Sequence, residues 1–301
     1  MASVGPEVDA VVRLLDEQAP HLAHLPLRPS ATSGSSNWVF RLGEELALRL
    51  PRTQDHADDL RKEVRWLPVL GPALTAPVPE VVLAGEPSET FDRPWAVVTW
   101  VPGETPVGLD GDQQVALAEG LGELVRSLHA IDAGGQPAGA EHWGYRAGEP
   151  VTPRIDAWAE EVADDLADLF DPAAVREAWR RLRDVPPATA PPVWVHTDLS
   201  GENVLVGPDG RLAGVIDFGG LGVGDGSVDL LYAWSLFEEP ARTVFRTAAG
   251  ADDATWARAR AWAFVGPGLL TIDGYRDTMP ERTRQLTAMV TAVAAEVGVS
   301  L

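Results

Sequence analysis

The segment from Val193 to Asp229 alternates short apolar runs with polar residues more closely than any other part of the chain. The runs Val193–Val195, Val204–Val206 and Leu212–Ile216 are rich in β-branched side chains, which favour strands. The last two runs flank Gly-Pro-Asp-Gly, a turn sequence that is typical of a hairpin. The pattern therefore predicts a small sheet whose loops carry the polar residues in between.

The hydrophobic pattern changes character near residue 100. Before that point most apolar runs are short and predict strands, at residues 38–42, 46–50, 80–84 and 95–100. Segments 7–18 and 55–70 instead space their apolar residues three and four apart, as helices do. Later on the helical spacing dominates, at residues 114–131, 155–170, 172–182, 230–237, 240–249, 254–271 and 281–297. We therefore predict an α+β protein with a β-rich domain, residues 1–100, and a mostly helical domain, residues 101–301.

Three oxygen-bearing side chains stand in the loops of the predicted small sheet. Asp198 and Asn203 follow the strand 193–195, and Asp217 ends the return strand of the hairpin. We expect the hairpin to bring the three side chains together. Carboxylate and amide oxygens, with phosphate oxygens and water, are the ligands that Mg²⁺ prefers. Such a cluster suits phosphoryl transfer from a nucleotide, in which a carboxylate also orients the attacking hydroxyl.

The spacing of these residues resembles that of a known family. In protein kinases the catalytic-loop Asp is followed five residues later by a metal-binding Asn, and another metal-binding Asp precedes Phe-Gly. HTDLSGENVLV and the later GVIDFGGLGVGDGSVDL resemble the corresponding loops of the aminoglycoside phosphotransferase family, kinase-like antibiotic kinases that include the macrolide kinases. The resemblance implies a two-lobed protein-kinase-like fold with a small β-rich N-lobe and a large helical C-lobe. It makes Asp198 the catalytic residue and Asn203 and Asp217 the Mg²⁺ ligands, although Thr197 and Ser200 depart from the glycine and the histidine or proline frequent there.

The same resemblance implies a nucleotide-binding site in the N-lobe. It makes Ser35 and Ser36 contacts of the phosphates, in a loop of small residues whose backbone N–H groups can approach phosphate oxygens. In the macrolide-kinase branch a strand similar to LALRLPR carries the cation that binds the donor phosphates. This role falls to Arg49, with Arg52 as the alternative, because the planar guanidinium forms paired hydrogen bonds with phosphate. Glu63, on the helix 55–70, is the expected partner that orients Arg49.

The resemblance also implies a hinge between the two lobes. There the carbonyl of Thr99 and the amide of Val101 are expected to pair with the edge of the purine, which leaves the choice between ATP and GTP open. Two further acidic residues have expected structural roles. Asp225 and Asp229 are both expected to cap or brace, with Asp229 opening the helix 230–237 in the manner of an N-cap.

Composition and charge exclude several other classes of protein. The chain of 301 residues has no cysteine, which excludes a disulfide framework and a thiolate metal site. It lacks a signal-peptide pattern and an apolar run of membrane-spanning length, so we expect a cytoplasmic protein without a membrane partner. The net charge of −21 argues against nucleic acid as a partner, because phosphate-backbone binding needs clustered Lys and Arg. Acidic residues outnumber basic ones 31 to 15 after residue 100, a field that could attract a cationic substrate or serve solubility alone.

The sequence thus predicts a phosphotransferase that uses ATP or GTP with Mg²⁺ and phosphorylates a hydroxyl of a small molecule. The resemblance favours a macrolide-type or nucleoside antibiotic as acceptor, because LALRLPR and RKEVRWLPVLGPAL are similar to the macrolide-kinase branch. The alternatives are an aminoglycoside acceptor and a metabolic kinase for a sugar, a choline-like compound or an amino alcohol. From another class, a catalytically inactive binding module with the same fold is the alternative against which the three polar residues argue.

Overall fold

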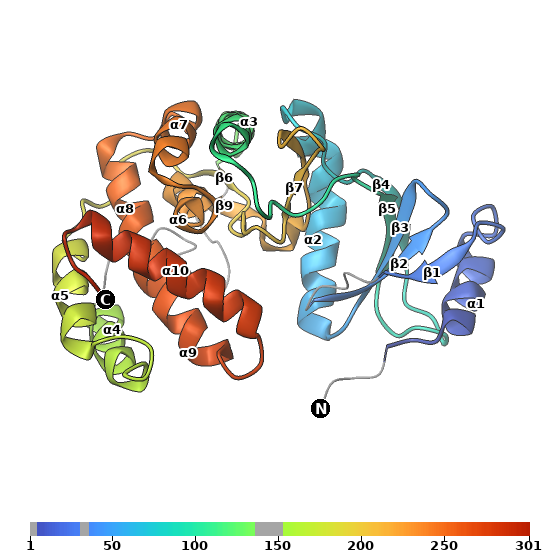
Figure 1. Ribbon diagram of the computed structural model, residues 1–301. Coiled ribbons are helices and arrows are strands. Elements are labelled where there is room, and N and C mark those ends of the chain that lie inside the picture. The colour runs from blue at the N-terminus through green and yellow to red at the C-terminus, as the bar shows by residue number, and fades with distance from the viewer. Residues whose placement is uncertain (1–4, 31–35, 136–152) are drawn as a thin grey trace. The chain divides into compact units, whose positions relative to one another are not determined.

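The chain forms two compact units, which we describe from a computed structural model that covers residues 5–30, 36–135 and 153–301 (Figure 1). The first unit consists of Met1–Pro102 with Ala213–Gly219, and the second of Gly103–Leu212 with Gly220–Leu301. The chain therefore returns once to the first unit before it completes the second. Among the helices in the described ranges, none has the length and apolar content that crossing a lipid bilayer requires.

Five strands form the antiparallel sheet of the first unit, in the order β1-β2-β3-β5-β4. β3 is therefore the central strand, with β2 and β5 as its neighbours. The strands are β1 (Leu27–Pro29), β2 (Asn37–Leu42), β3 (Leu46–Pro51), β4 (Val81–Gly85) and β5 (Trp95–Thr99). The helical elements of this unit are α1 (Val8–Gln18), α2 (Gln54–Leu70) and the short turn η1 (Gly71–Ala73).

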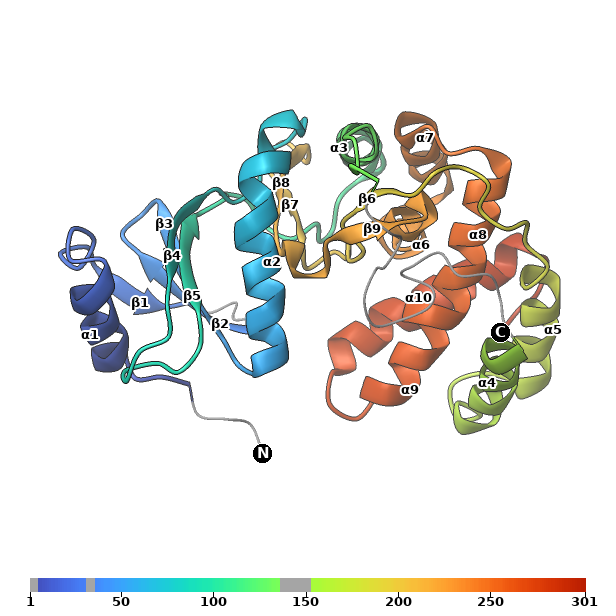
Figure 2. The ribbon, with the colours of Figure 1, turned by 180° about the vertical axis from the view of Figure 1, so that it is seen from behind.

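One helix covers each face of this sheet, as Figures 1 and 2 show from opposite sides. Because side chains alternate between the two faces along a strand, Leu48 and Leu50 pack in the cluster that contains α1. Ala47 packs instead with Leu60 of α2. Arg49 follows the same alternation and points to the α2 side. The alternation of side chains along β3 thus places Arg49 between the sheet and α2.

The second unit is mostly helical. Its helices are α3 (Gly111–His129), α4 (Pro153–Asp165), α5 (Pro172–Leu182), α6 (Ala233–Leu236), α7 (Glu239–Ala249), α8 (Asp253–Ala263), α9 (Thr271–Tyr275) and α10 (Pro280–Glu296). Between them lie the 3-10 turn η3 (Gly226–Leu230) and the π-helix η4 (Phe264–Leu270). Its strands β6 (Val193–Val195) and β9 (Gly222–Gly224) form an antiparallel pair.

The segment that returns to the first unit begins in a tight turn. β7 (Val204–Val206) leads into this turn, and β8 (Leu212–Val215) leaves it. The amide of Gly207 donates to the carbonyl of Arg211 at 2.9 Å and so closes the turn. After β8 the chain forms the 3-10 turn η2 (Phe218–Gly220) and re-enters the second unit. Asp217 lies between β8 and η2.

The structure corrects several predicted elements. The predicted helix 254–271 is α-helical only over α8 and widens into η4, which contains Pro267, because proline cannot donate the hydrogen bond of a regular helix. The predicted helix 230–237 is replaced by η3 and the short α6. β1 and β9 were not predicted, because their sequences, Leu-Arg-Pro and Gly-Val-Gly, lack the β-branched apolar run that marks β6 and β7.

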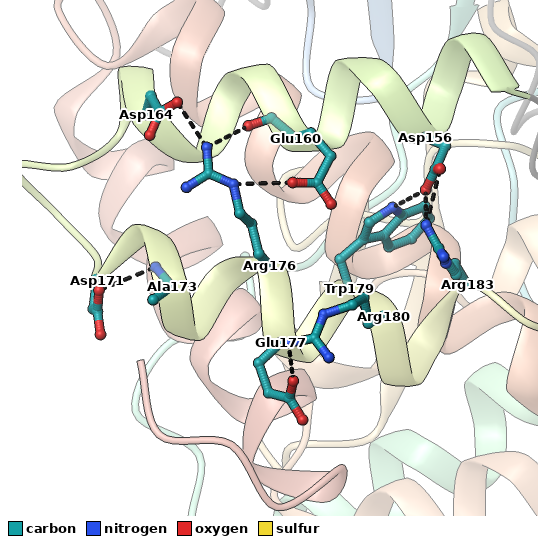
Figure 3. Close-up of polar contacts among 10 residues, drawn as sticks. All are labelled: Asp156, Glu160, Asp164, Asp171, Ala173, Arg176, Glu177, Trp179, Arg180 and Arg183. Atoms are coloured by element: carbon teal, nitrogen blue, oxygen red, sulfur yellow. Dashed lines mark hydrogen bonds and ion pairs between the residues drawn. The ribbon is translucent and has the colours of Figure 1, made fainter.

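Facing side chains of α4 and α5 form an ion-pair network, shown in Figure 3. Arg176 of α5 donates to the Glu160 carboxylate at 2.9 Å. Asp156 of α4 accepts from the indole Nε1 of Trp179 at 2.9 Å and from the guanidinium of Arg183 at 2.7 Å. Desolvation raises the pKa of Asp156, but the hydrogen bonds from Arg183 and Trp179 outweigh it and leave the pKa below its ordinary value.

Asp156→Asn should remove a contribution to stability that depends on pH. Because the pKa of Asp156 is depressed in the folded state, its contribution is present above the ordinary value of 3.8 and is lost as the pH falls through the lowered pKa. We expect the variant to be less stable at pH 7 by a few tenths to about 1 kcal/mol, since the pair is partly exposed. Urea unfolding at pH 7 and at about pH 3 measures this.

The gap between Asp156→Asn and the unchanged protein should shrink at the lower pH. Asp165→Asn, in an exposed position at the end of the same helix, is the matched control and should show no such pH dependence. A gap of equal size at both pH values would refute the assignment of the stabilising contact to the ionised carboxylate.

α3 approaches α7 closely at Gly122. A Cβ atom on Gly122 would lie 2.6 Å from the Cβ of Ala248, and 2.9 Å from the amide of Ala249 and the carbonyl of Phe245. We expect Gly122→Ala to lower the free energy of unfolding by about 1–3 kcal/mol, because backbone atoms of α7 must move. Urea unfolding tests this, with Gly111→Ala as control, since a Cβ at Gly111 of the same helix has no neighbour within 4 Å. Equal stability of the two variants would contradict the close approach.

Candidate active site

The first unit contains a buried guanidinium that is held by two carboxylates. Arg49, opposite Val39 on β2 and Ala96 on β5, is 9% exposed. Its Nη1 donates to both carboxylate oxygens of Glu63 on α2, at 2.5 and 2.6 Å. Its Nη2 donates to Oδ1 of Asp217 at 3.0 Å. The central strand, the helix on one face of the sheet and the segment after β8 thus meet at a single side chain.

Electrostatics keep this guanidinium charged. Burial would lower the pKa of Arg49, but the charges of Glu63 and Asp217 and their hydrogen bonds outweigh it and raise the pKa above its ordinary value. Glu63 is itself 1% exposed, so each charge of the pair depends on the other for compensation. The predicted partnership of Arg49 with Glu63 is therefore present as a buried ion pair. The chain has one lysine, Lys62, whose Nζ lies 3.6 Å from Oδ1 of Asp59, also on α2.

Asp217 has an unusual backbone conformation. Its φ is +64°, in the left-handed region that non-glycine residues rarely occupy. The backbone amide of the next residue, Phe218, donates to the Glu63 carboxylate, and the Phe218 ring is fully buried. These contacts hold the bend, while 37% of the Asp217 side chain remains exposed. Such strain often marks functional sites, and here it turns a carboxylate out of the strand.

The other residues predicted for the nucleotide site lie in the first unit too. Ser35 falls outside the described residues. The carbonyl of Ser36, just before β2, accepts from the amide of Arg52 at 2.9 Å, so Arg52 lies beyond the end of β3 as expected of the less favoured cation. The amide of Thr99 donates to the carbonyl of Glu80 at 2.9 Å. In the described part of the chain, the amide of Val101 donates to no other backbone group, so its pairing with a purine stays a prediction.

The second unit contains the loop that carries Asp198 and Asn203. The loop follows β6, and the amide Nδ2 of Asn203 donates to the Asp198 carbonyl at 2.8 Å and to Asp198 Oδ2 at 3.0 Å. Oδ1 of Asp198 is buried without a hydrogen-bond partner in the described structure. His196 is fully buried, and its Nδ1 accepts from the Asp198 amide at 3.3 Å, which braces the loop. Asp198 thus has one carboxylate oxygen held by Asn203 and a second, buried oxygen whose hydrogen bonding is unsatisfied in the described structure.

A buried carboxylate fixes the start of this loop. Thr197 has a φ of +74°, and its amide donates to Oδ1 of Asp229 at 2.8 Å. Oδ2 of Asp229 lies 2.9 Å from Nε2 of His129 on α3. Asp229 is 1% exposed and belongs to η3, so the prediction that it is the N-cap of a helix 230–237 is wrong. Asp225 does cap η3, and it also pairs with Arg258 at 2.6 Å.

The structure brings the predicted residues together in two groups. Arg49, Glu63 and Asp217 meet in the first unit, and Asp198 and Asn203 meet in the second. The convergence of Asp198, Asn203 and Asp217 on one metal ion stays a prediction. Sequence reasoning expected Asp229 to cap or brace but missed its partner His129 and its contact with the loop of Asp198. No spacing rule connects two residues that lie a hundred positions apart on a helix and a 3-10 turn.

The side chains present fit Mg²⁺ rather than a metal that needs a cage of protein ligands. Within the described ranges there is no group of three or more His, Cys, Asp or Glu residues that could hold an ion. Mg²⁺ is bound through one or two protein oxygens, phosphate oxygens and water. Asp217 offers a carboxylate oxygen beyond the one that binds Arg49. Asn203 uses its amide nitrogen on Asp198, which turns its amide oxygen away from that carboxylate.

Comparison with known proteins agrees with this chemistry. The family model described as phosphotransferase enzyme family matches residues 29–262. An aminoglycoside 3'-phosphotransferase of Escherichia coli is 29% identical over 218 residues, which is 70% of this chain and 73% of that protein. An aminoglycoside 3'-phosphotransferase of Streptomyces fradiae is 31% identical, over 63% of this chain and 68% of that protein.

Solved structures confirm the predicted kinase-like fold. The GDP complex of aminoglycoside 2'-phosphotransferase-IIIa aligns with a TM-score of 0.67 at 19% identity, over 95% of this chain and 98% of that chain. A macrolide 2'-phosphotransferase from Brachybacterium faecium aligns with a TM-score of 0.61 at 23% identity, over 95% and 98% of the two chains. At these identities the likeness concerns the fold, a small antiparallel sheet unit and a large helical unit.

Removing Glu63 should leave Arg49 buried with too little compensation. We expect Glu63→Ala to lower the free energy of unfolding by about 3–5 kcal/mol, the range for breaking a buried ion pair. The double variant Arg49→Met with Glu63→Leu should recover most of this loss, because it removes both charges and fills the space. Asp58→Ala, at an exposed site of the same helix, should change stability by less than about 0.5 kcal/mol. Urea unfolding measures all three; a double variant as unstable as Glu63→Ala would contradict the role of charge.

Proposed function

Because the chain belongs to the phosphotransferase enzyme family, we propose that it transfers the γ-phosphate of ATP or GTP to a hydroxyl group of a small-molecule antibiotic. The observation that carries the proposal is the Arg49 guanidinium held between Glu63 and Asp217, since a structural ion pair alone gives no reason for a strained carboxylate beside a buried cation. The family that the sequence motifs resemble is thus the family to which the chain belongs.

Asp198 is the proposed catalytic residue. Its Oδ2 is held by the Asn203 amide, and its Oδ1 is the oxygen that would accept the hydrogen bond of the acceptor hydroxyl. A carboxylate in this position aligns the hydroxyl oxygen with the phosphorus and takes its proton as the bond forms. Asp229 supports this geometry because it accepts a hydrogen bond from the amide of Thr197, the residue before Asp198. His129 in turn contacts the other carboxylate oxygen of Asp229.

Arg49 is the proposed contact of the donor phosphates. Glu63 fixes its position, and Ser35, Ser36 and the backbone of Thr99 and Val101 complete the proposed nucleotide site. When bound by Asn203 and Asp217, Mg²⁺ would supply charge neutralisation between the donor phosphates. The planar guanidinium can exchange part of its hydrogen bonding from carboxylate to phosphate without a change of charge.

A macrolide-type or nucleoside antibiotic is the favoured acceptor. The support is the similarity of LALRLPR and RKEVRWLPVLGPAL to the macrolide-kinase branch. An aminoglycoside is the second candidate, favoured by the names of the two relatives that are 29% and 31% identical. Two further relatives are named viomycin phosphotransferase, from Streptomyces vinaceus, and homoserine kinase, from Gluconobacter oxydans. Acceptors other than macrolides, nucleosides and aminoglycosides are therefore further candidates.

Incubation with Mg²⁺, ATP or GTP and a panel of macrolides, nucleoside antibiotics and aminoglycosides tests the proposal. We expect a mass gain of about 80 daltons, one phosphoryl group, on at least one antibiotic. Asp198→Asn should lower kcat by roughly 10²–10⁴-fold, because the amide cannot take the proton. Mass spectrometry of the products and the rate of nucleoside diphosphate release give both quantities.

Asp209→Asn is the matched control for Asp198→Asn. Asp209 stands in the turn between β7 and β8, and 64% of its side chain is exposed. The chemical change is the same as in Asp198→Asn, but it stands in an exposed turn, so kcat should stay within about twofold. Undiminished turnover of Asp198→Asn would refute its catalytic role. Nucleotide binding without transfer to any acceptor would favour the inactive binding module instead.

A further inference from the structure

An arginine of the second unit lies beside the catalytic loop. Arg282, in the first turn of α10, places its Nη1 3.6 Å from a carboxylate oxygen of Glu202, which precedes Asn203 in the loop. Arg282 also forms a side-chain hydrogen bond with Tyr232 and interacts electrostatically with Asp198. Only 23% of its side chain is exposed. None of the family motifs in the sequence includes this arginine.

The same arginine lines a small pocket together with residues of the catalytic loop. Ser200, Glu202, Tyr232 and Arg282 are among the residues that bound it. Ser200 is 7% exposed, and its hydroxyl oxygen has no hydrogen-bond partner within the described structure. The pocket encloses only about 10 Å³, room for one water molecule, so a water rather than a substituent of the acceptor would meet this hydroxyl. Arg282 therefore bears on the acceptor through its charge beside the loop of Asp198 and not by lining a binding cavity.

The charge around this pocket is smaller than the loop alone would give. Asp198 and Glu202 each contribute one negative charge, and Arg282 cancels one of them. Burial lowers the pKa of Arg282, but Tyr232, Asp198 and Glu202 outweigh it and raise the pKa, so the cancelling charge is permanent. A polycation beside Asp198 therefore meets one net negative charge instead of two, and it also meets a guanidinium that repels it.

We propose that Arg282 is the specificity-determining residue of the acceptor site, which sets it to take a hydroxyl compound with at most one positive charge and to disfavour a polyamine. This inference rests on the proposed function, because it takes Asp198 to mark the place of the acceptor hydroxyl. It deepens that function by naming the substrate class. A macrolide with one amino group or a nucleoside fits the class, and an aminoglycoside does not.

The test compares the affinity of two probes, kanamycin as a polyamine and a macrolide that carries one dimethylamino group. Isothermal titration of each probe gives the ratio of the two dissociation constants. In Arg282→Gln we expect this ratio to shift toward kanamycin by on the order of 10-fold, because one repelling charge is removed at short range. Glu202→Gln should shift the ratio the opposite way by about 2–3-fold, a smaller effect because that side chain is 55% exposed.

Two variants separate charge from structure. Arg282→Lys keeps the charge and should keep the original ratio within about twofold. Arg284→Gln removes a charge from the same turn of α10, but its side chain is 72% exposed, so the ratio should not change. If Arg282→Gln does not fold, as thermal unfolding would show, the opposite shift in Glu202→Gln decides the matter. An unchanged ratio in Arg282→Gln, or in Glu202→Gln where it alone folds, overturns the inference.

Binding and turnover are measured on the same protein samples. Failure to phosphorylate any antibiotic would defeat the proposed function, while the affinity ratio would still test Arg282. Phosphorylation of macrolides with an affinity ratio that ignores Arg282 would leave the function intact and defeat the inference alone.

Discussion

Much of the candidate site depends on the cost of burying charge. A guanidinium cannot be taken from water into a protein interior unless carboxylates accompany it with good hydrogen bonds. Arg49 satisfies this requirement with Glu63 and Asp217, and the three residues come from three separate stretches of the chain. The relation between the central strand β3, the helix α2 and the segment after β8 is therefore fixed by one ion cluster. Apolar packing on both sides of the sheet stabilises these elements but does not specify where a cation stands.

A buried charge also needs hydrogen-bonding partners in the second unit, where the buried group is a carboxylate. Asp229 is a buried carboxylate, and its two oxygens are satisfied by the Thr197 amide and the His129 ring. The first contact keeps Thr197 in a left-handed conformation that a threonine would otherwise avoid. Since Asp198 follows directly, the direction of the loop that carries this proposed catalytic residue depends on a side chain some thirty residues later. In each unit one buried charge holds one strained residue of the candidate site.

Local patterns predicted the parts of this arrangement that are local in the sequence. The spacing of Asp198 and Asn203 lies within one loop, while Arg49 and Glu63 were assigned from the resemblance of their strand and helix to the family. The Asp229 and His129 contact could not be predicted, because it joins elements that no short pattern links. η4 shows a second limit: helical periodicity continues across Pro267, although the missing amide hydrogen forces a wider turn. Hydrophobic period locates elements, whereas buried polar pairing is decided by tertiary structure.

The net charge of −21 is a poor guide to the acceptor. At physiological ionic strength the field of exposed charges falls off over about 8 Å, so most acidic residues act on encounter rather than on the bound acceptor. On the proposed function, the groups that act at the acceptor hydroxyl are the partly buried ones beside Asp198, where the charge of Arg282 opposes those of Asp198 and Glu202. A protein can therefore have a strongly acidic surface and still disfavour a polycation at the reacting atom. Selectivity for the acceptor is then a property of a few side chains shielded from solvent, and it can change between relatives without any change in the fold.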